Sequence, residues 1–432
     1  MNRCTANTKV SIPHKGIKMK KTAILILISL VVSASFVWGG DVPMDRLNAF
    51  SKKILDLREH VMGYPINQNV DLKEFYEWYV QSGLHNTSMN NVGNPRKSSA
   101  LLMNTHEFEN EVINFFAPLY GFTPEEAWGI VTSSGTDGND HGVYFGVKYL
   151  LAKTQMRPVL YVSEDAHYSI KKIGDLQNLE LKLIPSDVMG HMDVAKFEAA
   201  LETNKPALIV IAIGTTFKGA VDDQKGIDEV LQRKPPLAVY RHLDGALFGG
   251  YLPFSEHKEV IDRKLMHFDS IAVSGHKFFG FDEPCGFFIT TQDVLDRQNP
   301  FRVPYLNDAV PTITCSRSAL SPLKFWWKLQ RHSMADFQQQ AADILANATF
   351  FKAQLDEAGY PAWRNPNSNT VFFKRPSQAV MERYDLAMEE DPRLGGLLAH
   401  MIVMQNESRE EIEDLAASLK ADMAKDKAPA KP

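Results

Sequence analysis

The chain carries the run Ser270-Ile-Ala-Val-Ser-Gly-His-Lys-Phe-Phe-Gly280, in which an apolar, strand-like stretch leads to a single lysine among small and polar residues. An amine whose charged form is disfavoured becomes a nucleophile near neutral pH, so Lys277 is a candidate for Schiff-base formation. Taken alone, a lysine in a loop at a strand end usually keeps its charge in water. Its role therefore depends on what the rest of the chain places beside it.

Strand-like apolar runs alternate with amphipathic helical stretches through the middle of the chain. This alternation predicts an α/β fold with a mostly parallel sheet and helices on both faces. Ligands of such sheets gather at the carboxyl ends of strands, and both Asp244 and Lys277 closely follow predicted strands. The predicted strands cover residues 128–132, 158–162, 181–184, 207–213, 237–240, 270–273 and 286–289, and the helices residues 136–153, 167–178, 193–204 and 225–233.

The flanking regions predict a helical beginning and a smaller unit at the end. We expect a leader over residues 1–40, an N-terminal helical segment over 41–104, a large domain over 105–320, a small domain over 321–420 and a disordered tail over 421–432. The small domain is expected to contain a long helix at 322–354, strands at 370–373 and 400–404, and a helix at 409–420 with Ser408 as its cap.

The composition is that of a globular protein, with 432 residues of which 44% are apolar and 23% charged. A net charge of −5 gives no indication of a nucleic-acid partner. The three cysteines, Cys4, Cys285 and Cys315, lack the spacing of a metal site or a disulfide framework. We therefore expect neither a metal nor a nucleic-acid ligand.

The N-terminus is typical of a secretory signal. Lys18, Lys20 and Lys21 precede an apolar run over residues 22–38, which small residues follow. The run is slightly shorter than the ~20 residues that a membrane-spanning helix needs, so a retained anchor is the weaker alternative, and a buried helix is another. Removal of residues 1–40 would leave a net charge of roughly −11. We expect an exported chain without stable membrane association, with the cytoplasm as the alternative location.

Three further segments carry residues whose chemistry complements that of Lys277. The turn Thr132-Ser-Ser-Gly-Thr-Asp-Gly-Asn139 could present backbone N–H groups to a phosphate, although a plain capped turn is the alternative. His167 could stack on a pyridine ring, or could cap a helix or lie in the core. Asp244 could keep a pyridine nitrogen protonated, which makes the ring an electron sink. With Lys277, these segments stand in the order of a pyridoxal-phosphate enzyme.

With these segments, the chain resembles the pyridoxal-phosphate-dependent group II amino-acid decarboxylases, most closely the branch of bacterial histidine decarboxylase and plant serine decarboxylase. Because several motifs agree in order and context over roughly residues 60–405, the resemblance is highly specific. It implies an aspartate-aminotransferase-like (type I) fold with a small C-terminal α/β domain. It also implies a homodimer or a larger homo-oligomer. The matching segments are Asn90-Asn-Val-Gly-Asn-Pro95, Trp128-Gly-Ile-Val-Thr-Ser-Ser-Gly-Thr-Asp-Gly-Asn139, Ala166-His-Tyr-Ser169, Gly214-Thr-Thr-Phe-Lys-Gly-Ala-Val-Asp-Asp223, His242-Leu-Asp-Gly-Ala-Leu-Phe-Gly249, Val273-Ser-Gly-His-Lys-Phe-Phe-Gly280 and Pro284-Cys-Gly286.

The resemblance implies a role for individual residues. Lys277 would hold pyridoxal 5'-phosphate as a Schiff base, Asp244 would bind the pyridine nitrogen, and His167 would stack over the ring. Tyr305 resembles a family tyrosine on a mobile loop and is the candidate proton donor, with a surface tyrosine as the alternative. Further cofactor contacts are expected from Ser134, Gly135, Thr136, Thr216, Asp222, Ala246, Ser274 and His276. Substrate contacts are expected from Tyr64, Asn90 and Asn91, in an N-terminal segment that would also supply dimer contacts.

The chain departs from the family at Cys315-Ser-Arg-Ser-Ala-Leu320, where members usually carry Gly-Ser-Arg-Asn-Gly-His. Ser318 and Leu320 thus replace an asparagine and a histidine. Asp137 likewise replaces a usual glutamate, and Asn94 a usual aspartate. A pocket that loses polar partners can bind a polar substrate less well by several kcal/mol. These departures leave the cofactor prediction intact and weaken the prediction of the substrate.

We therefore expect a carboxy-lyase that converts L-histidine to histamine and carbon dioxide through a Schiff base on Lys277. Serine, giving ethanolamine, is the next substrate, followed by other amino acids. A different reaction of the same cofactor, such as transamination or aldol cleavage, is an alternative because fold does not determine reaction type. An exported binding protein without turnover is the alternative from another class.

Overall fold

The computed structural model describes residues 42–58, 60–298 and 300–426, so the expected leader over residues 1–40 lies outside the described residues. The chain divides into two units, Met1–Asp56 and Leu57–Pro432. Helix α2 (Met44–Arg58) begins in the first unit. In the described ranges, no helix combines the length and the apolar character that crossing a membrane requires.

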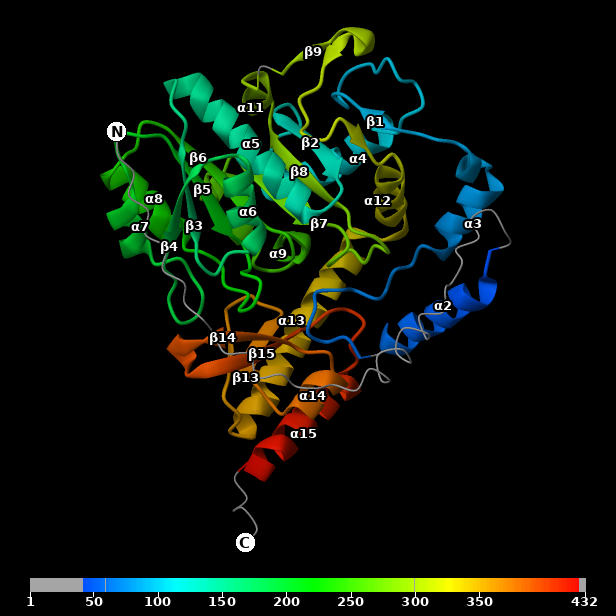
Figure 1. Cartoon of the computed structure of the whole chain (residues 1–432), viewed down its shortest axis with the longest axis vertical. Helices are drawn as coiled ribbons and strands as arrows, with labels where there is room; N and C mark the ends of the chain where they lie inside the picture. The colour runs from blue at the N-terminus through cyan, green and yellow to red at the C-terminus, as the bar shows by residue number, and fades with distance from the viewer. Residues whose placement is uncertain (1–41, 59, 299, 427–432) are drawn as a thin grey trace, which may run out of the picture. The chain divides into compact units, whose positions relative to one another are not determined.

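A seven-stranded sheet forms the centre of the second unit, with the strand order β2-β8-β7-β6-β5-β3-β4 (Figure 1). The five strands from β7 to β4 pair in parallel, whereas β8 runs antiparallel to both β7 and β2. The mostly parallel α/β sheet that the sequence predicts is therefore confirmed. Its strands are β2 (Ala127–Thr132), β3 (Val159–Ser163), β4 (Glu180–Ile184), β5 (Ala207–Ala212), β6 (Val239–Asp244), β7 (Ser270–Ser274) and β8 (Gly286–Thr291).

Helices cover both faces of this sheet, because alternate residues of its strands point to opposite sides. In β3, Leu160 and Val162 pack in one apolar cluster with residues of α5 (Gly135–Thr154) and α6 (Tyr168–Leu176). Tyr161, between them, packs in a second cluster with residues of α7 (Val194–Ala200) and α8 (Gln224–Arg233). Most of the strands are consequently buried on both faces, as expected for a parallel sheet.

The strand β6 extends further than the sequence predicts. The apolar run ends at Tyr240, yet the strand continues through Arg241 and His242 to Asp244. Arg241 forms an ion pair with Asp228, and His242 is hydrogen-bonded on both ring nitrogens, so polar side chains are satisfied inside the sheet. As a result, Asp244 is the last residue of the strand and not part of a following loop.

The long helix predicted over residues 322–354 is wrong, because the structure contains two helices, α12 (Leu320–Arg331) and α13 (Met334–Glu357). Ser333, between the two helices, has an extended backbone conformation that ends the helical path. Its hydroxyl accepts a hydrogen bond from the Asp336 N–H (3.2 Å), and the Asp336 carboxylate accepts one from the Ser333 N–H (2.7 Å). This capping box starts a new helix where the apolar periodicity alone predicts continuity.

The C-terminal part contains a four-stranded antiparallel sheet in the order β12-β13-β15-β14, with α14 (Gln378–Arg383) and α15 (Arg409–Asp426) (Figure 1, orange and red). The strands are β12 (Ala362–Arg364), β13 (Thr370–Lys374), β14 (Ala387–Asp391) and β15 (Gly396–Ile402). Disorder predicted from residue 421 onward is wrong up to Asp426, since α15 continues to that residue. Leu415 and Leu419 bury its apolar side, and Asp422 accepts a hydrogen bond from the Ser377 N–H (2.6 Å).

Short elements complete the second unit. Two small antiparallel pairs join β1 (Asn91–Val92) with β11 (Ser316–Arg317) and β9 (Arg302–Val303) with β10 (Asp308–Ala309). The remaining α-helices are α3 (Lys73–Gln81), α4 (His106–Phe116), α9 (Phe248–Tyr251), α10 (Arg263–Met266) and α11 (Gln292–Asp296). The 3-10 helices are η1 (Leu84–Asn86), η2 (Ala117–Tyr120), η3 (Leu252–Phe254), η4 (Lys258–Ile261), η5 (Pro304–Leu306) and η6 (Pro392–Leu394).

Candidate active site

Asp244, Lys277 and His167 lie at or just beyond the carboxyl ends of three parallel strands. Asp244 ends β6, Lys277 follows the end of β7, and His167 follows the end of β3. Since β6 and β7 are neighbours and β5 alone separates β6 from β3, these ends lie at one edge of the sheet. The topology thus brings together three side chains that are far apart in the sequence.

Electrostatic interactions show that the three groups share one site. Burial lowers the pKa of Lys277, and the Asp244 carboxylate acts in the opposite direction. Burial also lowers the pKa of His167, which Asp244 raises and Lys277 lowers further. A lowered pKa enlarges the fraction of neutral amine, the form that attacks a carbonyl carbon. The site therefore contains an activated amine, a carboxylate and a mostly neutral imidazole.

His242 lies behind Asp244 on the same face of β6 and is held in place on both sides. Its Nδ1 lies 2.8 Å from the Ser270 hydroxyl, and its Nε2 lies 3.0 Å from Oδ1 of Asn139. Burial lowers the pKa of His242 to about 4, so the ring is neutral at pH 7. A neutral His242 cannot neutralise Asp244. The carboxylate, which accepts a 3.3 Å hydrogen bond from the Ala246 N–H, is left available to an external cation.

The turn before α5 lies against the strand end that leads to Lys277. Ser134 caps α5, since its hydroxyl accepts a hydrogen bond from the Asp137 N–H (3.1 Å). A Cβ atom added to Gly135 would lie 2.3 Å from the Ser274 hydroxyl oxygen and 3.4 Å from the Ala246 Cβ atom. A side chain at position 135 would displace the Ser274 hydroxyl, and the close approach gathers Ser134, Gly135, Ala246 and Ser274 at the positive end of a 20-residue helix. Thr136, in the first turn of α5, is exposed.

The two histidines beside the candidate lysine are positioned by their neighbours. His167 caps α6, with its Nδ1 2.7 Å from the Ser169 hydroxyl, and its ring lies 4.3 Å from that of Tyr168 between centroids. His276 has its Nδ1 3.2 Å from the Cys285 carbonyl oxygen. Burial lowers the pKa of His276, a backbone hydrogen bond at Cys285 raises it, and Lys277 lowers it. Both imidazoles thus have little freedom to rotate.

Thr216 and Asp222 lie in the segment after β5. Thr216 is exposed, whereas Asp222 is buried and accepts hydrogen bonds from the Met192 N–H (2.7 Å) and the Ala212 N–H (2.8 Å). Burial raises the pKa of Asp222 to about 6. Ala212 pairs with Asp244 across β5 and β6, so Asp222 braces the strand end beside Asp244.

Tyr305 and Tyr64 are exposed to solvent. Tyr305 lies in η5, at the tip of the β9–β10 hairpin, with 82% of its surface accessible. Tyr64 also has an exposed side chain. For the described residues of this single chain, neither tyrosine is linked by a hydrogen bond to Lys277, Asp244 or His167. Their predicted roles stay predictions that depend on movement of the hairpin or on a second subunit.

Asn90 and Asn91 lie beside the segment that departs from the family, because β1 pairs with β11. Asn90 donates a 3.0 Å hydrogen bond to the Ser316 hydroxyl. Asn91 is fully buried, donating to Glu109 (3.1 Å) and accepting from the Thr105 N–H (2.8 Å). Both polar ends of the Asn91 side chain are therefore used inside the fold.

The residues that depart from the family have structural partners. Ser318 accepts a 3.0 Å hydrogen bond from the Ser321 N–H at the start of α12, and Arg317, which matches the family pattern, forms a buried ion pair with Glu109 beside it. Asp137 pairs with His141 (3.1 Å), and Asn94 accepts a 2.9 Å hydrogen bond from the Trp128 indole N–H. The sequence analysis did not single out Glu109 or His141. The spacing of four residues between Asp137 and His141 is the one signal that could have indicated such a pair.

A polar cluster that the sequence analysis missed joins the C-terminal sheet to the loop that carries His167. Asp391, the last residue of β14, forms ion pairs with Lys218 and with Arg393 (2.8 Å). Arg393 also contacts Asp165 (2.9 Å) and Glu164 (3.1 Å), which precede His167 in the chain. No spacing in the sequence predicts the contacts of Asp391 with Lys218 and of Arg393 with Asp165, because each pair is more than 170 positions apart.

The arrangement fits pyridoxal phosphate. A buried amine, a carboxylate that forms no ion pair with another described residue and a neutral imidazole meet at one sheet edge, and a turn containing the closely packed Gly135 opens a helix beside them. These groups match the aldehyde, the pyridine nitrogen, the ring and the phosphate of that cofactor. Lys277, Asp244 and His167 would hold the reactive part, and Ser134, Gly135 and Ser274 the phosphate.

Comparison with known proteins agrees with this fit. Residues 147–367 match the family model of the pyridoxal-dependent decarboxylase conserved domain. The chain is 34% identical over 382 residues to histidine decarboxylase from Solanum lycopersicum, an alignment that covers 86% of this chain and 87% of that protein. It is 33% identical over 364 residues to serine decarboxylase 1 from Oryza sativa subsp. japonica, with coverage of 83% and 71%. The solved structure of L-methionine decarboxylase from Streptomyces sp. 590 shares the fold, with a TM-score of 0.78 at 23% identity, covering 91% of this chain and 98% of that chain.

Proposed function

The chain belongs to the family of pyridoxal-dependent decarboxylases, and we propose that its substrate is L-histidine, which it converts to histamine and carbon dioxide. It is a pyridoxal-phosphate-dependent amino-acid decarboxylase, and hence a carboxy-lyase. The convergence of Lys277, Asp244 and His167 at one sheet edge is the observation that carries the assignment of the site. The similarity to histidine decarboxylases, including one from Vibrio campbellii at 32% identity, supports the choice of substrate.

Each residue of the site has a distinct task. Bound pyridoxal phosphate supplies a protonated pyridine ring that accepts the electrons released when the carboxylate leaves. Lys277 supplies the amine that holds the cofactor covalently, and its lowered pKa favours this attachment. Asp244 keeps a proton at the ring nitrogen, since a buried carboxylate favours the charged form of a nearby base. His167 offers a neutral aromatic face in the same site.

Tyr305 is the proposed proton donor to the carbon that loses the carboxylate. Its phenol lies on the β9–β10 hairpin, where an exposed side chain is free to close over a bound substrate. Protonation at this carbon yields the amine product.

A panel of amino acids given to the purified holoenzyme tests the substrate. We expect carbon dioxide and histamine from L-histidine at a higher kcat/KM than from any other amino acid. If the enzyme prefers to form ethanolamine from L-serine, then serine and not histidine is its substrate. An α-keto acid as the main product would contradict decarboxylation. The K277A variant is the matched control, because it should retain the fold and produce no amine above background.

We further propose that the chain forms a homodimer or a larger homo-oligomer with the active site near the subunit interface. Tyr64, Asn90 and the exposed Tyr305 could then face a site completed by the second subunit. Light scattering on the purified protein checks this, and a monomer that is fully active would contradict it.

We also propose that the protein is exported, on the basis of the signal-like sequence over residues 19–40. Fractionation of tagged protein, followed by N-terminal sequencing of the mature form, tests the proposal. A start near residue 40 in the exported fraction is the expected result. An intact segment from Met19 to Trp38 on a cytosolic protein would contradict it.

A further inference from the structure

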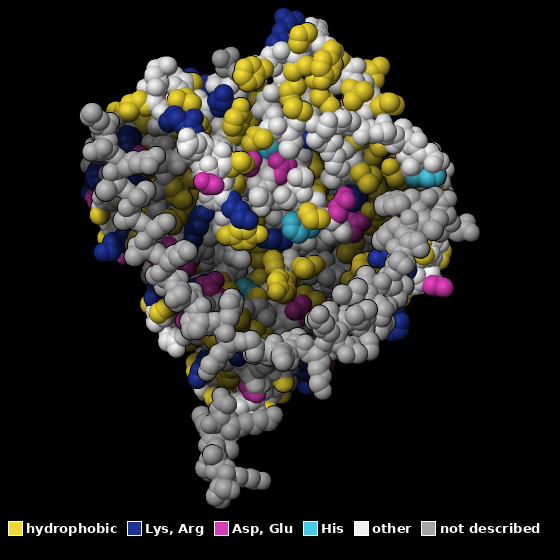
Figure 2. Space-filling view, viewed as in Figure 1, with side chains coloured by type: hydrophobic (Ala, Val, Ile, Leu, Met, Phe, Trp, Pro, Cys, Tyr) yellow, Lys and Arg dark blue, Asp and Glu magenta, His cyan; other side chains and the backbone are white. Residues whose placement is uncertain are grey.

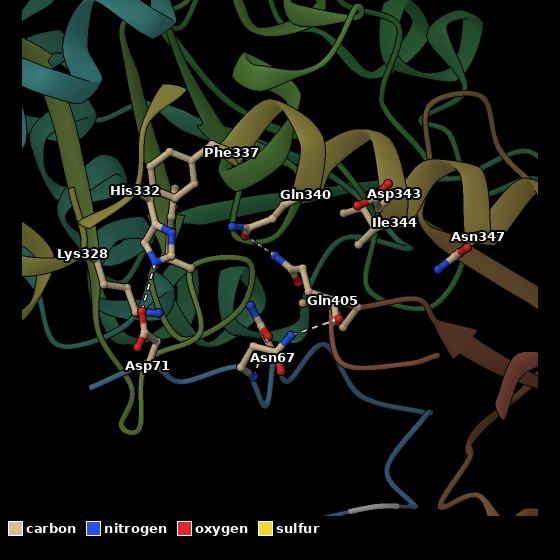
Figure 3. Close-up of a pocket in the computed structure, with 13 residues that line it drawn as sticks. Asn67, Asp71, Lys328, His332, Phe337, Gln340, Asp343, Ile344, Asn347 and Gln405 are labelled. Atoms are coloured by element: carbon tan, nitrogen blue, oxygen red, sulfur yellow. Dashed lines mark hydrogen bonds and ion pairs between the residues drawn. The ribbon is translucent and has the colours of Figure 1, made fainter. Parts of the chain in front are cut away.

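A cavity of about 300 Å³ lies away from the residues assigned to the cofactor (Figure 3). It is bounded by the end of α12, the first half of α13 and two connecting segments, one of which contains Asn67 and Asp71 and the other Gln405. None of the predicted cofactor residues lines it. Asn67 and Gln405, however, both donate hydrogen bonds to the carbonyl oxygen of Phe278 (2.9 and 2.8 Å), the residue after Lys277. The cavity therefore adjoins the segment that carries the candidate lysine.

The side chain of Lys328 lines the cavity and is largely buried. Lys328, in the last turn of α12, exposes 5% of its surface. Within the described part of the chain, Nζ of Lys328 makes no hydrogen bond or ion pair, and it lies 5.6 Å from the centroid of the Phe281 ring. Burial lowers the pKa of Lys328 to about 8, while Asp71, Cys285 and Asp282 act in the opposite direction. The amine is accordingly still protonated at pH 7.

Lys324, one turn earlier on the same helix, is a buried lysine that pairs with acidic side chains. Its side chain is fully buried, and its ammonium donates to Asp282 (2.9 Å) and to Glu283 (2.6 Å). A buried charge is costly unless it is paired. Lys328, unlike Lys324, forms no ion pair with an acidic side chain among the described residues.

The acidic side chains that line the cavity do not pair with Lys328. Asp71 pairs with His332 at 3.4 Å, and it influences Lys328 only through its field. Asp343 lies on the side of the cavity opposite Lys328, is exposed, and accepts a 2.8 Å hydrogen bond from Gln339 (Figure 3). The remaining wall includes the apolar side chains of Phe279, Phe337 and Ile344.

We propose that this cavity binds a small organic carboxylate whose charge pairs with Lys328. A single cation matches a monoanion and not a phosphate dianion, because Asp71 would repel the second negative charge. The apolar wall fits a short hydrocarbon chain, and the volume admits a molecule of a few carbon atoms. An ion pair in a largely buried site is electrostatically stronger than one at the surface.

Thermal unfolding of the holoenzyme in propionate tests the proposal. A ligand that binds the native state raises the unfolding temperature as its concentration increases. Sodium propionate would replace sodium chloride at constant ionic strength, so that general salt effects cancel. We expect the unfolding temperature to rise with propionate in the wild-type protein, and the apparent affinity to fall at least about tenfold in K328M.

Three variants make this result specific. K328M should fold, because methionine is apolar and of similar length, and K328R, which keeps the charge, should retain a propionate effect. K225M removes an exposed lysine of α8 and should respond as the wild type does. Propionate that binds in the active site affects all variants alike, so the difference between K328M and K225M isolates the cavity. No rise in the wild-type protein, or an equal rise in K328M, would overturn the proposal, and neither result depends on turnover.

Discussion

Lys277 owes its predicted reactivity to its surroundings and not to its own chemistry. Burial lowers its pKa, and the carboxylate of Asp244 limits that shift. His242 is neutral and hydrogen-bonded on both ring nitrogens, and among the residues that the structure describes Asp244 forms no ion pair, although it acts electrostatically on Lys277. The proposed site residues Lys277, Asp244 and His167 thus interact electrostatically at one edge of the sheet.

Tyr305 can be tested by removing its hydroxyl. We expect Y305F to bind the cofactor with an unchanged absorbance spectrum, because the side chain lies on an exposed hairpin. Amine formation should fall by about 10²- to 10⁴-fold, the usual contribution of a general acid. Rates and products would be measured by mass spectrometry of histamine and of the corresponding aldehyde, the side product expected once the carboxylate has been lost. Wild-type rates with an intact spectrum would refute the role of Tyr305.

Lys328 makes stability depend on pH in a defined direction. Its pKa is about 8 in the folded protein and 10.5 ordinarily, so the unfolded chain binds more protons between these values. The free energy of unfolding should therefore rise between pH 8 and pH 10.5, relative to K328M, by about 3 kcal/mol at most. Urea unfolding of both proteins over this range, without propionate, measures the difference. An unchanged difference across the range would show that the amine is not desolvated.

At the scale of elements, the ion-pair cluster around Asp391 joins the C-terminal sheet to the loop after β3. Lys218 and Asp391 each expose 1% of their side chains. Burial raises the pKa of Asp391, but hydrogen bonds from Arg393 and Lys218 outweigh burial and lower it overall. The cluster fixes Glu164 and Asp165, and through them it limits the freedom of His167.

Removing one partner of this buried pair should cost more than removing both. K218M leaves the buried Asp391 carboxylate with Arg393, which still donates to both of its oxygens, so we expect a loss of about 3 kcal/mol of unfolding free energy, the lower end of the range for breaking a buried pair. The double variant K218M/D391L should recover most of this loss, because it leaves no buried charge from the pair. Chemical denaturation measures both values. Equal stability of K218M and the wild type would show that the pair contributes nothing.

The elements also show where sequence patterns succeed and where they fail. The seven sheet strands could be predicted because each is a continuous apolar run in a sheet buried on both faces. The end of β6 could not be predicted in this way, because Arg241 and His242 are polar. Their polar groups bind partners elsewhere in the sequence, Asp228 and Asn139. The break between α12 and α13 had a local signal, Ser333 and Asp336 at capping-box spacing, which the apolar periodicity obscured.

The candidate site was predictable to a similar extent. Lys277, Asp244 and His167 were identified from motifs in loops and turns, and strand topology then placed them together. The partners that orient them, such as Asn139 for His242, required the fold to be known. The cavity at Lys328 had no sequence signal, because the absence of a partner is visible only in three dimensions.

At the scale of the whole molecule, cofactor binding and folding should be linked. A ligand that binds only the native state stabilises it by about 2.7 kcal/mol at 100 times its dissociation constant. We therefore expect the apoenzyme to unfold at a lower temperature than the holoenzyme. Added pyridoxal phosphate should raise the unfolding temperature of the apoenzyme to that of the holoenzyme. K277A should show a smaller restoration, since it loses the covalent attachment. Equal unfolding temperatures with and without cofactor would contradict a site built into the fold.

The central claim is that Lys277 is the covalent anchor of pyridoxal phosphate, and reduction of the holoenzyme with borohydride followed by peptide mass spectrometry tests it most directly. Reduction converts a Schiff base into a stable secondary amine, which marks the lysine that carried it. We predict that the cofactor is recovered on the peptide containing Lys277 and on no other. Labelling of a different lysine, or an unlabelled Lys277 in a protein with the cofactor absorbance, would contradict the account.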